Sequence, residues 1–131
     1  MRILLPLLLL ATPALAHEYR VSGITIDHPF AYATEGPTAE GYVILVNEGA
    51  ADTLLQVTGD NGVSLTAPVP LPAGQATEFL PGGLHIDFAG LTAPWEEGDQ
   101  ISATLIFENA GAVPVVFYVE ARPEDAEAPE G

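Results

Sequence analysis

The chain contains no cysteine and no lysine, and it has only one methionine and three basic residues, all of them arginine. Without cysteine, the protein cannot form disulfides, thiolate zinc sites or iron–sulfur clusters, and it has no cysteine nucleophile. The 18 acidic residues bring the formal net charge to −15, so the chain lacks the basic footprint that binds a phosphate backbone. Together with the missing lysine, these absences exclude most enzyme classes and exclude nucleic acid as a partner.

Length and composition predict one small β-domain. A chain of 131 residues suits a single domain, and a hydrophobic fraction of 48% is enough to fill a core. The 13 glycines and 12 prolines are spread along the chain. They disfavour long helices and favour many short elements joined by turns.

The N-terminal segment has the three-part pattern of a secretory signal peptide. Arg2 is followed by the apolar run Ile3–Leu10, and Ala14 and Ala16 are the small residues expected before a cleavage site. The run is too short to cross a membrane core, which needs about 20 helical residues. We therefore expect residues 1–16 to be removed, leaving a periplasmic protein that begins at His17 and does not span a membrane.

Short apolar stretches predict about seven to nine β-strands, without helical periodicity. The run Tyr42–Val46 is continuously apolar, as in a strand buried on both faces. The stretch 84–88 alternates, so Leu84, Ile86 and Phe88 are expected to face the core. Further strands are predicted at 19–26 with a break near Gly23, at 54–57, 63–69 and 76–80, and in a hairpin of 100–108 with 113–120. This pattern predicts an all-β antiparallel sandwich over residues 17–121 and an acidic, disordered tail at 122–131.

The three histidines are the candidate metal ligands. His85 shares a face of its predicted strand with Asp87, so the pair could offer an imidazole and a carboxylate to one ion, or could form a solvated polar face. His17 could chelate an ion through its ring and the terminal amine, or could be a solvated terminus. His28 precedes Pro29, which favours an extended conformation, and we expect it to be hydrogen-bonded to Asp27 or to a backbone carbonyl.

The acidic residues have the pattern of a solvated surface. The turn at 96–99 lacks the ligand spacing of a calcium loop. The sequence also contains no phosphate-binding loop, no His-Glu-x-x-His motif and no nucleophile elbow. We therefore predict no catalytic residue and no enzymatic activity.

Several stretches, in one order along nearly the whole chain after Ala16, resemble the PCu(A)C family of periplasmic copper chaperones. They are Ile24–Ala31, Gly41-Tyr42, Asn47, Pro72–Gly74, Pro81–His85, Gly90-Leu91, Gly98-Asp99 and the β pattern up to Val119. The resemblance implies an immunoglobulin- or cupredoxin-like Greek-key sandwich. It also implies a role in handing copper to acceptor proteins of oxidase assembly.

The resemblance implies a Cu(I) site of two histidines and two methionines, but this chain departs from that pattern. His85 matches the histidine of the family's His-x-Met pair, while Asp87 and Val63 stand where the methionines should be. The segment that carries the other histidine has no counterpart between about Val57 and Gly62. Because Met1 is the only methionine, no sulfur ligand remains after cleavage, and nitrogen and oxygen ligands favour Cu(II) or Zn(II) over Cu(I).

Three functional hypotheses follow. The first is a copper-handling protein with an altered or weak site formed by His85, Asp87 and His17. The second is a β-sandwich that binds no metal and uses its acidic surface to select basic partners. The third is an oxidising enzyme built on an N-terminal copper chelate.

Overall fold

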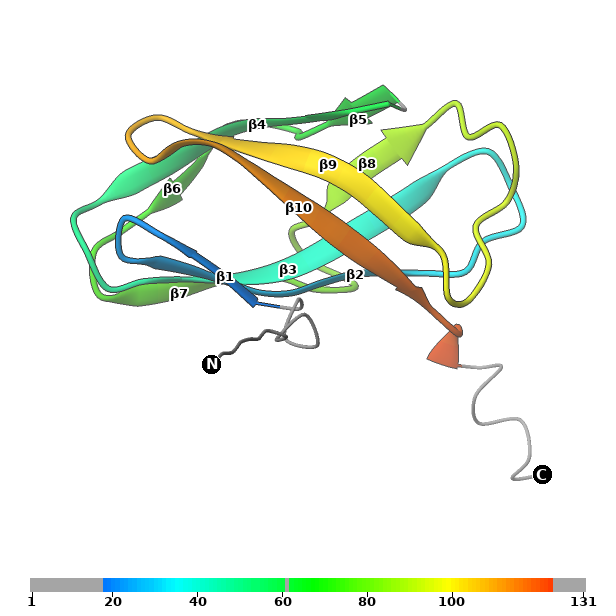
Figure 1. The fold of residues 1–131 in the computed structure, drawn as a ribbon, viewed down its shortest axis with the longest axis horizontal. Helices are drawn as coiled ribbons and strands as arrows, with labels where there is room; N and C mark the ends of the chain where they lie inside the picture. Colours follow the sequence, from blue (N-terminus) through cyan, green and yellow to red (C-terminus); the bar gives the residue numbers. More distant parts are fainter. Residues whose placement is uncertain (1–17, 61, 124–131) are drawn as a thin grey trace, which may run out of the picture.

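The computed structural model describes residues 18–60 and 62–123, which form ten β-strands (Figure 1). The predicted signal peptide, His17 and most of the predicted acidic tail lie outside the described residues. None of the described segments forms a helix long and apolar enough to cross a membrane. The strands are β1 (Glu18–Val21), β2 (Ile24–Tyr32), β3 (Ala39–Asn47), β4 (Asp52–Gly59), β5 (Gly62–Ser64), β6 (Val69–Leu71), β7 (Gln75–Phe79), β8 (Ile86–Ala89), β9 (Gln100–Phe107) and β10 (Gly111–Glu120).

The strands join in one sheet that curls over itself. Its order is β5-β8-β3-β2-β10-β9-β4-β6, with β1 added to β2 and β7 added to β3. Figure 1 shows β2, β3 and β7 along one side of the molecule and β4, β5 and β9 along the other. The predicted all-β fold is confirmed, and the pairing is antiparallel except that β10 runs parallel to β2. These two strands are distant in the chain, so no hairpin forces them to run in opposite directions.

The core is built from alternating residues of these strands. From Ala103 onward in β9 and from Val115 onward in β10, every second residue is buried, as the period of a β-strand requires. In β3 most residues are buried, in agreement with its continuous apolar run. The largest fully buried side chains are Phe79, Phe88, Phe107, Phe117, Ile24, Ile26, Leu45, Leu54, Leu71, Ile86, Leu105 and Val43.

The predicted break near Gly23 is a tight hairpin turn between β1 and β2. Ser22 and Gly23 have φ angles of 48° and 84°. Positive values at both central residues define the type I′ turn, whose twist matches that of the paired strands. The predicted final hairpin is also confirmed, as β9 and β10 pair from Phe107↔Gly111 to Gln100↔Tyr118.

Two strand predictions are wrong. The predicted strand at 63–69 is two strands, because β5 pairs with β8 while β6 pairs with β4 at the other end of the sheet. The strand predicted from Leu84 begins only at Ile86, and the Leu84 side chain is 46% exposed instead of facing the core. A turn closed by a hydrogen bond from the Gly83 amide to the Leu80 carbonyl precedes it, so strand pairing starts later.

Two buried polar residues, Asn47 and Asp52, form hydrogen bonds that hold the loops at one end of the sandwich. The Asn47 amide donates to the carbonyl oxygens of Ala50 and Leu71 at 2.8 and 2.9 Å, and its oxygen accepts from the Gly49 amide at 2.9 Å. Because all these bonds are satisfied, the side chain can be buried without a large penalty.

Asp52 is the second of these residues. Its carboxylate accepts from the backbone amides of Thr53, Asn109 and Ala110 at 2.7, 2.8 and 2.9 Å. Burial raises the pKa of the Asp52 carboxyl, but these hydrogen bonds, led by that from Asn109, outweigh it and leave the pKa below its ordinary value. Asp52 therefore ties the start of β4 to the β9–β10 turn as a charged acceptor.

Candidate metal centre

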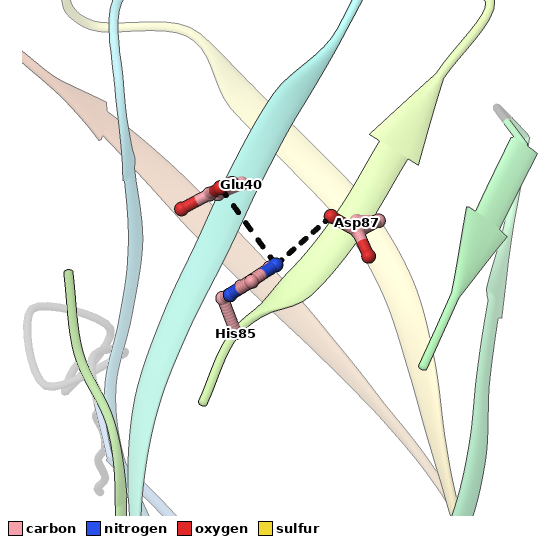
Figure 2. A group of neighbouring side chains, drawn as sticks. All are labelled: Glu40, His85 and Asp87. Atoms are coloured by element: carbon pink, nitrogen blue, oxygen red, sulfur yellow. Dashed lines mark ion pairs between the residues drawn. The ribbon is translucent and has the colours of Figure 1, made fainter. Parts of the chain in front are cut away.

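Strands β3 and β8 position three potential metal ligands on one surface (Figure 2). Glu40 on β3 and Asp87 on β8 are direct cross-strand partners, so their side chains lie on the same face. His85 lies two residues before Asp87, just ahead of β8, and it turns its ring toward both carboxylates. The predicted juxtaposition of His85 and Asp87 is thus observed, and Glu40 is a third member that the sequence analysis missed.

The three side chains come close enough to share one ion. The Nε2 atom of His85 lies 3.1 Å from Oδ1 of Asp87 and 3.7 Å from Oε2 of Glu40. One potential ligand atom from each residue lies within 4.8 Å of the other two. The side chains are 31%, 45% and 46% exposed for His85, Glu40 and Asp87, so the group is open to solvent.

A backbone carbonyl orients the imidazole. Nδ1 of His85 lies 2.9 Å from the carbonyl oxygen of Gly83. Since a carbonyl only accepts, Nδ1 must carry a proton, and a neutral ring then presents an unprotonated Nε2 to the two carboxylates. This is the arrangement found around metal-bound histidines, in which a second hydrogen bond fixes the tautomer.

The same contacts stabilise the protonated ring when no ion is bound. The Gly83 hydrogen bond is the largest cause that raises the pKa of His85. Partial burial opposes it, and the charges of Glu40 and Asp87 add to it, so the pKa lies above its ordinary value. A proton and a metal cation therefore compete for the same nitrogen.

Tyr42 holds Glu40 in place. Its hydroxyl donates to Oε1 of Glu40 at 2.8 Å, which leaves Oε2 directed toward His85. Burial and the bond to Glu40 raise the pKa of Tyr42 far above its usual value, so the hydroxyl stays protonated and remains a donor. The ring packs against Phe30 and Tyr32 at centroid distances of 5.2 and 5.9 Å, which limits its movement.

The other sequence-predicted positions do not join this group. His17 lies outside the described residues. Val63, which replaces a family methionine, is on β5 opposite Phe88 and packs against the core. The described residues include no methionine and no cysteine, so none of them can supply sulfur to this centre.

His28 is placed differently from its prediction. It has a φ angle of 53° at an irregularity of β2 between Asp27 and Phe30, so the expected extended conformation is wrong. The cause is the shift in pairing with β3 at this point, which turns the backbone locally. Its Nε2 lies 2.8 Å from Oε2 of Glu120 on β10, and its ring stacks on Phe30 at 5.0 Å, so Glu120 is a partner that the sequence analysis did not predict.

Comparison with known proteins shows the family to which the chain belongs. A family model described as "Putative lipoprotein LpqE-like" matches residues 24–119, which include Glu40, His85 and Asp87. The chain belongs to the LpqE-like family. This LpqE-like chain is also 44% identical over 50 residues to "Putative lipoprotein Lxx21020" of Leifsonia xyli subsp. xyli. That stretch is 38% of this chain, and it is only 30% of the length of that relative.

Solved PCuAC domains share the fold of this LpqE-like chain. The apo PCuAC domain from PmoF1 has a TM-score of 0.77 and 28% identity, over 81% of this chain and 100% of that domain. The copper-bound PCuAC domain from PmoF2 has a TM-score of 0.74 and 29% identity, over 81% and 99%. These matches confirm the resemblance to the PCu(A)C family. Apo-DR1885 from Deinococcus radiodurans, at a TM-score of 0.57 and 15% identity over 92% and 93%, shares the fold alone.

Proposed function

We propose that this PCu(A)C-type domain handles copper as Cu(II), bound by Glu40, His85 and Asp87. The observation that carries the proposal is the convergence of one imidazole and two carboxylates within 4.8 Å, on a fold whose relative from PmoF2 binds copper. The ion is cargo, to be accepted and released, and no catalytic step is assigned to it.

The donor set fits the divalent ion better than the monovalent one. Cu(I) prefers soft thiolate and thioether ligands, and the three residues supply only nitrogen and oxygen. Two carboxylates also compensate a divalent charge, whereas a monovalent ion would leave one of them uncompensated. Three donors leave a position of a four-coordinate site open, and His17 is the predicted residue to test there.

The cellular setting is part of the same proposal. The signal pattern of residues 1–16 supports export to the periplasm. Family membership supports acceptor proteins of oxidase assembly as partners. Exposure of all three ligands to solvent is consistent with release to such a partner, since a deeply buried ion would dissociate slowly.

A second candidate is a protein-binding module that holds no metal. The observation in its favour is that His85, when protonated, already forms a complete ion-pair group with Glu40 and Asp87. In that case the three residues stabilise the β3–β8 pairing and require no ion.

A metal titration separates the two candidates. The chain beginning at His17 is titrated with Cu(II), Zn(II) and, under reducing conditions, Cu(I), and compared with His85→Asn, Glu40→Gln and Asp87→Asn. We expect a Cu(II) dissociation constant below about 1 mM, weakened at least about tenfold by His85→Asn. Electron paramagnetic resonance should show coupling to imidazole nitrogen, and this coupling should be weaker in His85→Asn, which lacks one of the proposed imidazole ligands.

Two further forms complete the test. His28→Asn is the matched control, because His28 also faces a carboxylate but lies in no cluster of three ligands within the described residues, and asparagine tolerates its positive φ. It should bind Cu(II) as the parent does. One residue added before His17 should weaken binding only if the terminal amine is a ligand. Tight Cu(I) binding, or no response to any ion, would contradict the proposal.

A further inference from the structure

Strands β6 and β7 are consecutive in the chain but do not pair with each other. β6 pairs with β4 and β7 pairs with β3, so the turn at 72–74 crosses between the two sides of the sandwich. Asn47 closes this end, because its side chain donates to the Leu71 carbonyl and its own carbonyl accepts from the Gly74 amide. The two strands diverge from there and leave an open groove of about 540 Å³.

The walls of this groove, which we call the β6–β7 groove, are mainly apolar. Segment 65–70 forms one wall, with Leu65, Pro68 and Pro70, and the other wall contains Phe79 and Leu84. Leu84, at 46%, and Leu55, at 41%, are the large apolar side chains most exposed among the described residues, and only Leu84 lines this groove. Its volume lies within the range of about 300–1,000 Å³ typical of ligand sites.

The two walls offer different chemistry to an occupant. Among the described strands, β7 pairs only with β3, so its second edge exposes backbone donors and acceptors, and its five residues include no proline. Such an edge is a template for an added strand. The opposite wall contains two prolines, which have no amide hydrogen, so this wall can offer an occupant apolar contacts but few hydrogen bonds. An extended peptide can form hydrogen bonds with the β7 edge and apolar contacts with the opposite wall, whereas a compact small molecule would leave the backbone groups of the β7 edge unpaired.

The negative charge around the groove favours a basic peptide as its occupant. His85 lies at the rim of the groove, with Glu40 and Asp87 beside it, and Glu78 is exposed on β7. The whole chain carries a net charge of −15, so a second copy would be repelled. A basic segment would be attracted and correctly oriented by the same field.

We propose that the β6–β7 groove binds an extended apolar segment of a basic partner protein, which adds a strand to the free edge of β7. Alternate side chains of this segment fill the groove, and its flanking lysines or arginines face the acidic rim. Binding requires no metal, so this inference goes beyond the proposed function and does not depend on it.

The test uses a defined peptide and metal-chelated protein. The probe is a fluorescein-labelled ten-residue peptide of alternating valine and lysine, compared with a valine–glutamate peptide and with a valine–lysine peptide N-methylated at alternate residues. Leu84→Asn removes an apolar contact at the groove. Leu55→Asn removes a similarly exposed leucine elsewhere and is the matched control.

We expect only the unmethylated valine–lysine peptide to bind, with about fivefold weaker binding to Leu84→Asn and unchanged binding to Leu55→Asn. Amide protons on the free edge of β7 should become protected from exchange. Equal binding of all three peptides, no binding, or self-association of the free protein that Leu84→Asn abolishes would overturn the inference. Because the peptide assay uses metal-chelated protein and the Cu(II) titration uses no peptide, failure of the metal proposal remains distinguishable from failure of this one.

Discussion

Replacing Asp52 by alanine should destabilise the domain more than any other single loss of an acidic side chain among the described residues. The carboxylate is 7% exposed and accepts three backbone hydrogen bonds, two of them from the β9–β10 turn. Alanine would leave the amides of Asn109 and Ala110 without these acceptors. The substitution would also remove the hydrogen bonds that connect the start of β4 to the β9–β10 hairpin.

The magnitude can be worked from these contacts. A hydrogen bond to a charged group contributes about 1.5–3 kcal/mol when its partner is buried, and an orphaned donor costs about 1–3 kcal/mol. The turn at 108–110 is partly exposed, so water can replace some of the lost bonds and the lower values apply. We expect the free energy of unfolding to fall by about 2–4 kcal/mol for Asp52→Ala, and by about 1–2 kcal/mol for Asp52→Asn, which keeps one acceptor oxygen.

Urea unfolding followed by tryptophan fluorescence measures this change. Trp95 is the only tryptophan, and it is 6% exposed against Phe88, so its emission reports on the core. Asp60→Asn is the control, since it removes the same charge from an exposed position and relieves the same general repulsion. Equal midpoints for Asp52→Asn and Asp60→Asn would refute the reasoning, because the hydrogen bonds to Asp52 would then contribute nothing.

Three further predictions follow from the same structure. The pKa of Asp52 is lowered in the folded protein, so the stability contributed by its carboxylate should be complete above the unfolded pKa of about 3.9 and should disappear as pH falls through the lower folded pKa. The difference in unfolding free energy between the parent and Asp52→Asn should therefore vanish at low pH, and a difference that persists at the lowest pH would contradict the prediction. Tyr42→Phe removes the hydroxyl that donates a hydrogen bond to Glu40, so Cu(II) affinity in the titration above should weaken about three- to tenfold while the urea midpoint changes little. Unchanged affinity would show that Glu40 does not need this hydrogen bond to bind the ion. Gly41→Ala would place a methyl group 2.8 Å from Cε1 of Phe88 in the core, so the urea midpoint should fall by the equivalent of about 1–3 kcal/mol, and an unchanged midpoint would show that the ring can move aside.

Local patterns were sufficient for much of the fold. Side chains alternate with a period of two along any strand, so the buried positions of Ile86 and Phe88 and the shared face of His85 and Asp87 followed from spacing alone. The lack of sulfur ligands after Ala16 followed from composition alone, because the chain has no cysteine and its only methionine is Met1. The same reasoning failed at Leu84, where a preceding turn delays the strand, and at His28, where a bulge reverses the sign of φ.

The third residue of the candidate metal centre and the order of the strands depend on pairing between distant parts of the chain. Glu40 is 45 residues from His85 in the sequence, and only the antiparallel register of β3 with β8 brings its carboxylate beside the imidazole. The parallel contact of β10 with β2 and the divergence of β6 from β7 depend likewise on which strands meet across the curled sheet. No local pattern encodes these partners, because the alternation that buries one face of a strand is satisfied by many possible neighbours.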